Sequence, residues 1–403
     1  MSRVFLGAFG DPGHAFPMLA LGAALVEHGH EVQLQTWRRW EEAAVAAGLS
    51  FAAAPEYQVF PTRERPMKPY QAAVHAARAT RPVVRSFDPD FAVADILTPA
   101  PALAAELEGV PVATLVPHGH PHQAPGFPIY SIGARHPRTA VGRAFWRRAG
   151  RVVDGALERG RQEYNECRAR LGLGPLPWVH TGLSRELTLI GTLPQLEYPR
   201  SWPEWTRVVG PLQWELPGGA QVEPLPGSDP IVLVAPSTAQ DRSRSLLRAA
   251  LEGLASAPVR VLAAWGDGVP ADLQVPANAR VVPWMSYAAT MPGCDVVLTH
   301  GGHGTLSRAL TCGCPVVVCP AGGDMAENAA RVDWAGVGVR LPRRYGTPRG
   351  VRLAVERVLS RPALRDRVGA IARWSEANDG AARAVAELEA WAARREIRSR
   401  SAA

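Results

Sequence analysis

The sequence predicts an α/β protein made of two open halves with parallel sheets. Short apolar segments rich in β-branched residues alternate with amphipathic segments of helical period along most of the 403 residues. This alternation is typical of strands covered on both faces by helices. Residues 175–230 interrupt it with a concentration of proline, glycine and tryptophan, which indicates a linker. Ligands of such sheets bind at the carboxyl ends of the strands, so we expect a binding cleft between the halves.

The first half opens with a β–α–β unit. An apolar strand at residues 3–9 is followed by a turn, a helix over residues 16–28 and a second strand over residues 31–37, and this order predicts parallel pairing. Further along we expect strands near residues 50–54, 91–94 and 112–116, a helix near residues 100–108, and a long arginine-rich helical stretch over residues 143–172.

A second alternating series begins after Pro230. Its most informative part runs from Cys294 to Asn328 and contains a buried strand, a glycine-rich turn, a helix, another strand and a loop that ends in an acid. The other expected elements are strands at residues 231–235, 259–265, 280–282 and 338–341 and helices over residues 242–254, 348–359 and 363–398. We divide the chain into an N-terminal domain (1–212), a linker (213–230), a C-terminal domain (231–375) and a terminal helix with its tail (376–403).

Composition excludes several classes of protein. With 47% hydrophobic and 20% charged residues, the chain has the profile of a globular protein, and no apolar run suits a transmembrane helix. The first residues lack the pattern of a signal peptide, so we expect a cytoplasmic location. The formal net charge is +7, but arginines and acids are interleaved and no nucleic-acid-binding module is present. We therefore interpret the charge as a solvated surface and expect no nucleic-acid partner.

The chain offers no convincing metal cluster. Its five cysteines lack the spacing of zinc or redox motifs, so we interpret them as buried thiols. His118, His120 and His122 alternate in one loop, which is weak support for a metal site. We expect neither a metal nor another cofactor, and the sequence does not separate a monomer from a homodimer.

The glycine-rich turn at residues 300–305 predicts an anion site. It opens a helix at the carboxyl end of a strand, and a helix N-terminus presents free N–H groups and a partial positive charge. The glycines let the backbone approach an anion, most often a phosphate. Asp324 and Asn328 add a second polar cluster after the next strand.

The turn of the first β–α–β unit is a second candidate site. Its glycines loosely resemble a dinucleotide fingerprint, but the spacing is wrong and Gln35 to Trp37 stand where an acid would hold a ribose. His14 lies at the helix start, where an imidazole can take a proton from a hydroxyl near neutral pH. Asp95, which follows a neighbouring strand, is the best candidate for the carboxylate that orients it. Capping or surface roles for the two side chains are the alternative.

The chain resembles the nucleotide-sugar-dependent glycosyltransferases of family 1 over nearly its whole length. The resemblance lies in GDPGHAFPMLALGAALVEHGHEV, in Asp95, and in WMSYAATMPGCDVVLTHGGHGT with GCPVVVCPAGGDMAENAARV. It implies the GT-B fold, with two Rossmann-like domains across a cleft and a C-terminal helix that crosses back to the N-terminal domain. It also implies inverting transfer of a sugar from a nucleotide diphosphate sugar to a small, partly apolar acceptor such as a natural-product aglycone.

The resemblance also implies roles for individual residues. His14 matches the general base for the acceptor hydroxyl, and Asp95 the carboxylate that orients it. Trp284 matches the aromatic that stacks on the nucleotide base, His300 the diphosphate contact and Asp324 the acid that binds sugar hydroxyls. Fixed donors stabilise the leaving charge in this chemistry, so no metal is required. Further donor contacts match Ser237, Thr238, Gly302, Gly304, Thr305 and Met325, and the acceptor pocket is expected to include residues 55–70, His118, His120 and Tyr130.

Two positions depart from the family pattern. Met325 stands where the family often has a glutamine that contacts the sugar, and Arg308 where it often has a glutamate that holds the ribose hydroxyls. A deoxygenated donor would leave those lost groups unpaired, so their absence favours a dTDP-deoxysugar over UDP-glucose. The alternative is that Glu327 or a main-chain group takes over these contacts.

Two other functions share the fold. A nucleotide-sugar 2-epimerase would need acidic catalytic residues in the cleft, and the His14–Asp95 pair argues against it. A non-catalytic protein that binds and activates another enzyme would not need His14 or an intact phosphate turn, and both are present.

Overall fold

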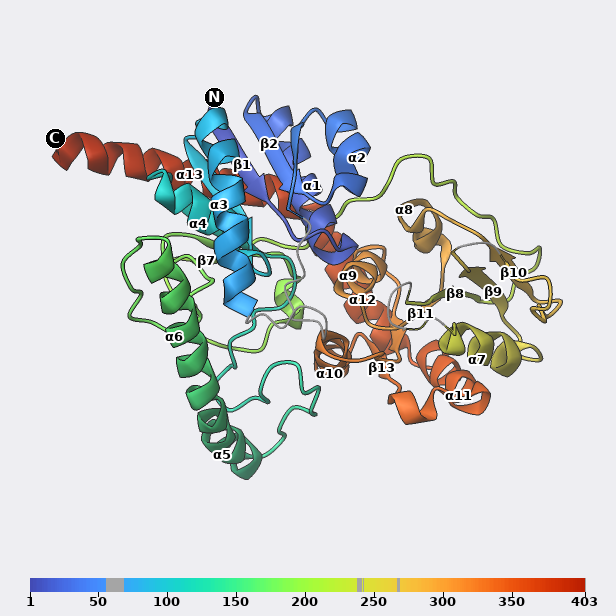
Figure 1. Ribbon diagram of the computed structural model, residues 1–403. Helices are drawn as coiled ribbons and strands as arrows, with labels where there is room; N and C mark the ends of the chain where they lie inside the picture. The colour runs from blue at the N-terminus through green and yellow to red at the C-terminus, as the bar shows by residue number, and fades with distance from the viewer. Residues whose placement is uncertain (56–68, 238–240, 242, 267–268, 403) are drawn as a thin grey trace.

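The N-terminal sheet has seven parallel strands in the order β3-β2-β1-β4-β5-β6-β7. The computed structural model describes residues 1–55, 69–237, 241, 243–266 and 269–402, and Figure 1 shows two lobes, each built around one sheet. From β1 the chain moves first to one edge and then to the other, so a topological switch point lies between β1 and β4, where ligands of such sheets bind. The strands are β1 (Arg3–Gly7), β2 (Glu31–Thr36), β3 (Ser50–Ala53), β4 (Phe91–Asp95), β5 (Val112–Val116), β6 (Thr188–Ile190) and β7 (Thr206–Val208).

The C-terminal sheet has six parallel strands in the order β10-β9-β8-β11-β12-β13. Its switch point lies between β8 and β11, and β11 is followed directly by the glycine-rich turn. The prediction of two parallel-sheet Rossmann-like domains is therefore confirmed. The strands are β8 (Ile231–Ala235), β9 (Arg260–Ala264), β10 (Ala279–Val282), β11 (Val296–Thr299), β12 (Val316–Val318) and β13 (Gly338–Arg340).

Helices cover both faces of each sheet. In the N-terminal domain they are α1 (Pro12–Glu27), α2 (Glu41–Ala46), α3 (Pro69–Phe87), α4 (Pro99–Leu107), α5 (Ala140–Ala149) and α6 (Asp154–Arg170). Later helices are α7 (Ser245–Leu254), α8 (Tyr287–Thr290), α9 (His303–Thr311), α10 (Asp324–Ala335), α11 (Pro348–Leu359), α12 (Pro362–Glu376) and α13 (Gly380–Ala402). Short 3-10 helices span Arg38–Trp40, Gly150–Val153, Pro194–Leu196, Met291–Gly293 and Arg343–Tyr345. Among the described residues, no helix is both long enough and apolar enough to span a bilayer.

Alternation along β1 shows why the central strand needs cover on both sides. Val4 and Leu6 pack into the core that also holds α1, whereas Phe5 points to the opposite face and packs with Val84 of α3 and Ala104 of α4. All three strand residues are fully buried. A strand buried on both faces carries apolar residues at consecutive positions, which explains the short apolar runs in the sequence.

Two sequence expectations about chain organisation need correction. Residues 175–230 have the composition of a linker, but β6 and β7 lie within them and extend the N-terminal sheet. The stretch at 143–172 is two helices, α5 and α6, joined by the 3-10 helix Gly150–Val153. Composition misled at 175–230 because strands of three residues are too short to produce an apolar run.

The last helix returns to the N-terminal domain, as the GT-B fold requires. Figure 1 shows α13 running from the C-terminal lobe along α1. Val385 and Leu388 are fully buried in the core of the N-terminal sheet, and Trp391 meets Phe91 edge to face with ring centroids 5.7 Å apart. The two domains are therefore joined by an apolar contact as well as by the linker.

Replacing Leu388 by alanine should destabilise this contact. The side chain is completely buried, and Leu→Ala substitutions at such positions lower the free energy of unfolding by about 2–5 kcal/mol. Urea denaturation followed by tryptophan fluorescence measures the change. Leu353→Ala is the matched control, because Leu353 on α11 is exposed and should change the midpoint little. Equal effects of the two variants would contradict the role given to α13.

Candidate active site

His14 and Asp95 meet at the switch point of the N-terminal sheet. His14 lies in the first turn of α1, and Asp95 is the last residue of β4. The His14 Nδ1 and the Asp95 Oδ1 are 2.8 Å apart. Asp95 is almost fully buried, while 13% of the His14 side chain remains exposed. Because a carboxylate accepts the Nδ1 proton, the Nε2 of neutral His14 is left with a lone pair for a proton.

The loop between β1 and α1 is held in place by hydrogen bonds to its backbone. The N–H of Phe9 donates to the second oxygen of Asp95 at 3.1 Å, so the carboxylate has a partner on each oxygen. The carbonyl of Gly10 accepts from the indole of Trp40 at 2.8 Å and from the guanidinium of Arg39. A Cβ at Gly10 would lie 1.9 Å from the ring of Trp37, so only glycine fits at this position.

The electrostatics of His14 suit a proton acceptor near neutral pH. Burial lowers the pKa of the imidazole, but the charge and the hydrogen bond of Asp95, with smaller contributions from Asp11 and Asp324, raise it above its ordinary value. Burial and a bonded carboxylate thus have opposite effects on the pKa of His14. Asp324 belongs to the C-terminal domain, so charges from both domains act on His14.

The glycine-rich turn places His300 and the start of α9 at the second switch point. His300 follows β11, and its Nδ1 lies 3.3 Å from the carbonyl of Ala235 at the end of β8. Gly301 has a φ of +92°, and a Cβ at Gly302 would lie 2.6 Å from the His300 Nε2. The first two glycines therefore allow the tight turn, while the Gly304 position faces open space. Thr305 stands beside it in the first turn of α9.

Asp324 is the first residue of α10, and its charge acts on groups of both domains. Its charge contributes to the pKa of groups on both sides, although burial is the largest influence on each of them. From the N-terminal domain these groups are His14, His118 and Tyr130, and from the C-terminal domain His300. The residues predicted for the base, the sugar and the diphosphate are thus brought together.

Trp284 and Arg308 lie on elements that flank the turn. Trp284 follows β10 and is 53% exposed, which leaves its ring free to stack on a ligand. Arg308, on α9, is half-buried. Burial lowers the pKa of its guanidinium, and Glu215 partly offsets this. The Glu215 carboxylate accepts from the N–H of Tyr287 at 2.7 Å, at the start of α8.

The remaining predicted donor residues differ in accessibility. Ser237 follows β8 and is buried, and its carbonyl accepts from the guanidinium of Arg244 at 2.9 Å. Met325 is buried in the first turn of α10 behind Gly301. Thr238, and residues 56–68 of the expected acceptor segment, lie outside the described residues.

His118 and Tyr130 lie next to His14, whereas His120 points away from it. The rings of His14 and His118 are 5.8 Å apart, edge to face, and the Tyr130 hydroxyl is 3.2 Å from the His118 Nδ1. His120 is buried, and its ring packs edge to face against His122 and Trp202. Burial and the nearby His122 and Arg200 lower the pKa of His120 to about 2, so it stays neutral and supports the loop from behind.

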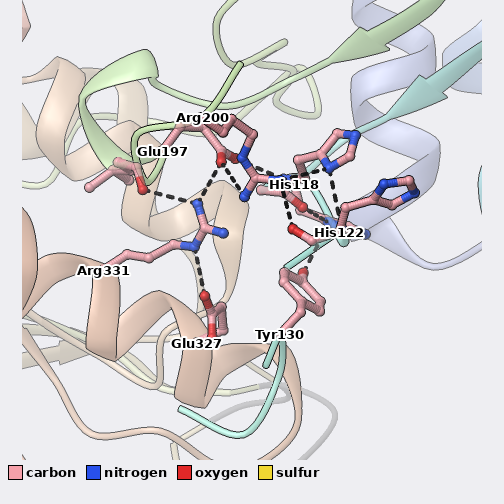
Figure 2. A network of polar contacts seen from close by, with 10 residues as sticks. His118, His122, Tyr130, Glu197, Arg200, Glu327 and Arg331 are labelled. Carbon is pink, nitrogen blue, oxygen red and sulfur yellow. Dashed lines mark hydrogen bonds and ion pairs between the residues drawn. The ribbon is translucent and has the colours of Figure 1, made fainter. Parts of the chain in front are cut away.

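A buried network of ion pairs joins the two domains beside this site (Figure 2). Arg331, on α10, is 2% exposed. Its Nη1 lies 3.0 Å from the Glu197 carboxylate of the N-terminal domain, and its Nε donates to Glu327 at 3.0 Å. Arg331 also donates to the carbonyl of Leu196, and Glu197 accepts from the N–H of His120 at 2.7 Å. The network therefore links α10 to the loop that carries the histidines.

The sequence did not predict the contacts that several of these residues make between the domains. Glu197, Glu327 and Arg331 are ordinary charged residues whose pairing appears only once the domains are placed together. His303 is a second such contact: its Nε2 lies 3.1 Å from the carbonyl of Gly191 in the N-terminal domain. Burial lowers the pKa of His303 to about 4, so the imidazole is neutral. The engagement of Glu327 with Arg331 contradicts the alternative that Glu327 replaces the missing ribose contact.

Comparison with known proteins gives one match over the C-terminal part of the chain and others over nearly its whole length. Residues 257–390 match the family described as Erythromycin biosynthesis protein CIII-like, C-terminal domain. The 4'-demethylrebeccamycin synthase of Lentzea aerocolonigenes is 28% identical over 400 residues, which cover 90% of this chain and 93% of that protein. The O-mycaminosyltylonolide 6-deoxyallosyltransferase of Streptomyces fradiae is 25% identical over 429 residues, or 97% of each chain.

Solved structures of similar fold cover nearly the whole chain. The calicheamicin glycosyltransferase CalG4 has a TM-score of 0.75 at 22% identity and covers 98% of this chain and 99% of its own. The glycosyltransferase of kitacinnamycin has a TM-score of 0.78 at 22% identity, with 97% and 99% covered. VinC has a TM-score of 0.71 at 19% identity, with 97% and 100% covered.

The fold and these matches define the chain as a glycosyltransferase of the GT-B class. More particularly, residues 257–390 resemble the C-terminal domain of an erythromycin biosynthesis protein, and the two full-length relatives are a 4'-demethylrebeccamycin synthase and a deoxyallosyltransferase. The resemblance to glycosyltransferases that the sequence predicted is therefore confirmed.

Replacing Arg331 by methionine should destabilise the closed arrangement of the domains. The change leaves the Glu327 carboxylate buried without its partner and leaves Glu197 with Arg200 alone, at 3.6 Å, and removing one member of a buried pair costs about 3–5 kcal/mol. Denaturation in urea measures the loss.

A triple variant, Arg331→Met with Glu197→Gln and Glu327→Gln, removes the stranded charges and should recover part of that stability. Arg349→Met is the control, because Arg349 is exposed. No difference between Arg331→Met and Arg349→Met would contradict the importance of the network.

Proposed function

We propose that the protein is an inverting glycosyltransferase that moves a sugar from a nucleotide diphosphate sugar to a nucleophile, a hydroxyl in the simplest case, on a small, partly apolar acceptor. The observation that carries the proposal is the 2.8 Å contact between the His14 Nδ1 and Asp95, opposite the start of α9 with Asp324 in between. A proton acceptor on one side and anion-binding N–H groups on the other suit the two charges that develop in a single displacement.

In the proposed reaction His14 acts as the general base. Its Nε2 takes the proton of the acceptor hydroxyl as the oxygen attacks the anomeric carbon, and the bond to the nucleotide diphosphate breaks on the opposite face. The configuration of that carbon therefore inverts. Asp95 is the positioning residue: it fixes the tautomer and stabilises the imidazolium, and the N–H of Phe9 in turn holds the carboxylate.

The leaving diphosphate is proposed to bind at the start of α9. The N–H groups of Gly302, Gly304 and Thr305 and the ring of His300 are the donors, and Ser237 with Thr238 adds a second contact. Burial keeps the pKa of His300 below its ordinary value, so the neutral ring has a single N–H. This N–H can reach the diphosphate once the ring gives up the 3.3 Å contact of its Nδ1 with the carbonyl of Ala235. Fixed donors of this kind stabilise a leaving anion without a metal ion, and we assign no metal or other cofactor to the reaction.

A dTDP-deoxysugar is the proposed donor. Trp284 would stack on the base, Asp324 would bind sugar hydroxyls, and the thioether of Met325 suits a deoxygenated sugar better than an amide would. Arg308 stands where a carboxylate would grip the ribose 2′-hydroxyl, which dTDP lacks. VinC, a protein of the same fold, has been solved in complex with dTDP, and SsfS6 complexed with thymidine diphosphate.

The acceptor is proposed to bind on the N-terminal side of the cleft, beside His118 and Tyr130. His118 lies edge to face with His14, so an acceptor hydroxyl held there would be within reach of the base. Burial raises the pKa of Tyr130, so its hydroxyl stays protonated and offers a hydrogen bond to the acceptor.

Replacing His14 by alanine should abolish transfer while leaving dTDP binding intact. We expect kcat to fall by about 100-fold or more, the usual contribution of a general base, measured with a panel of dTDP- and UDP-sugars and apolar hydroxyl acceptors. Thermal shift with dTDP reports binding separately. Turnover by the unaltered protein also separates an enzyme from a non-catalytic partner, and equal kcat for the variant would overturn the role of His14.

The variant Asp95→Asn supplies the pH control for this prediction. Asp95 raises the pKa of His14, and the base must be unprotonated, so activity falls as the pH drops through that pKa. Loss of the carboxylate charge should lower kcat and move this acid limb of the profile to lower pH. A limb that stays in place would show that His14 is not the titrating base.

Replacing Arg308 by glutamate should improve the use of UDP-sugars relative to dTDP-sugars. A carboxylate at this position could accept from the ribose 2′-hydroxyl, and we expect the ratio of the two kcat/KM values to rise about tenfold, the scale of a charged hydrogen bond. Arg308→Gln is the matched control, because it removes the positive charge without adding a carboxylate. An unchanged ratio in Arg308→Glu, or the same rise in both variants, would contradict the assignment.

A further inference from the structure

The positive charge of the protein is concentrated in one segment of the N-terminal domain. Residues 109–153 contain no aspartate or glutamate but six arginines. The whole chain has 44 Lys+Arg and 37 Asp+Glu, so the remainder has 38 and 37 and is close to neutral. The expectation that arginines and acids are interleaved is therefore wrong here. The six are Arg135, Arg138, Arg143, Arg147, Arg148 and Arg151, and the last four lie on α5 and the 3-10 helix that follows it.

These six arginines, which we call the arginine cluster, have no charged partner within the described part of the chain. All six are exposed, and none of their side chains forms an ion pair or hydrogen bond with another described residue. Some exposed arginines elsewhere are paired: Arg85 contacts Glu108 at 3.0 Å, and Arg365 contacts Asp295 at 2.6 Å. Unpaired arginines close together repel one another, so an anionic partner would relieve that repulsion.

An apolar stripe runs beside the arginine cluster. Val141 and Phe145 lie one turn apart on α5 and are 80% and 60% exposed, and Val152 on the following 3-10 helix is 80% exposed. No residue of α5 is buried. Arg148 follows Phe145 by three positions and thus flanks the stripe. Figure 1 shows α5 at the outer edge of the N-terminal domain, away from the C-terminal lobe.

We propose that α5 and the following 3-10 helix form a docking surface for an anionic phospholipid bilayer. Exposed apolar side chains next to arginines are the composition of a helix that lies in the membrane interface: the apolar side chains enter the acyl boundary and the guanidinium groups bind lipid phosphates. The surface is distinct from the reaction centre, so the proposal does not depend on the sugar-transfer mechanism.

A bilayer fits these features better than nucleic acid or an acidic protein. Nucleic acid would use the charge, but it offers no apolar phase for Val141 and Val152, and aliphatic side chains supply no stacking. A lipid surface can contact both the apolar stripe and the arginine cluster. It is also wide enough to reach the arginines of α5 and those of the loop before it. Because each contact is weak, the expected association is reversible.

Vesicle co-sedimentation of the full-length protein tests the proposal. The protein should bind vesicles that contain phosphatidylglycerol, bind phosphatidylcholine vesicles much less, and be released by added salt. The variant with Arg147→Gln, Arg148→Gln and Arg151→Gln should bind about a hundredfold more weakly, since each arginine near an anionic surface contributes about fivefold. Val141→Ser with Phe145→Ser should weaken binding about tenfold through lost apolar contact.

Matched controls keep the result specific to α5. Arg349→Gln, Arg357→Gln and Arg361→Gln remove three exposed arginines of the C-terminal domain, and Leu353→Ser removes an exposed apolar side chain there; neither should change binding much. Circular dichroism and transfer to a water-soluble acceptor should be unchanged in all variants. The proposal is overturned if the unaltered protein ignores anionic vesicles, if the two arginine triples lose binding equally, or if the Val141/Phe145 variant binds as before, which would indicate a purely electrostatic surface.

Discussion

Arg331 puts a positive charge at the junction of the two domains, and one carboxylate from each domain compensates it. A charge this deeply buried is tolerated only when its partners are in place, so the pairing constrains how the domains sit together. Asp324 opens the same helix two turns before Arg331, which makes the position of Asp324 opposite His14 depend on the pair. On the other side Glu197 also holds the N–H of His120. One buried cation thus fixes the position of α10 relative to the loop that carries His118 and His120.

Parallel topology explains why the polar groups of the site are where they are. In both sheets successive strands are added first toward one edge and then toward the other, which creates a switch point between the two central strands. The residues that follow these two strands meet there. The same arrangement produces opposite electrostatics in the two domains. In the first, Asp95 lies at a strand end and raises the proton affinity of His14. In the second, α9 presents its N-terminus, and its glycines leave room for an anion. The fold therefore places a carboxylate-bound imidazole at one switch point and a glycine-rich helix N-terminus at the other.

How far the sequence could predict this site depended on whether a feature is local. The contact of His14 with Asp95 was predictable, because both residues follow strands of one sheet and such ends converge. The anchoring of Asp95 by the N–H of Phe9 was not, since a backbone donor leaves no pattern in side-chain identity. Arg331 and Glu197 are 134 positions apart, and their pairing depends on the packing of two domains. The strands β6 and β7 were hidden in a linker-like composition because they are only three residues long.

The acceptor side of the cleft connects to α5 through a short stretch of chain. Tyr130 precedes Gly133, where a Cβ would lie 2.6 Å from Ala326 of α10, so the loop passes over the donor helix before the arginine cluster begins. A partly apolar acceptor concentrates in membranes, whereas a nucleotide sugar stays in water. A domain that docks on anionic lipid through α5 would bring its acceptor pocket to that pool. The C-terminal domain, which lies apart from α5 (Figure 1), would remain in contact with the aqueous donor. This arrangement requires that the positive charge be concentrated in the N-terminal domain. A uniformly charged surface would hold both domains against the bilayer.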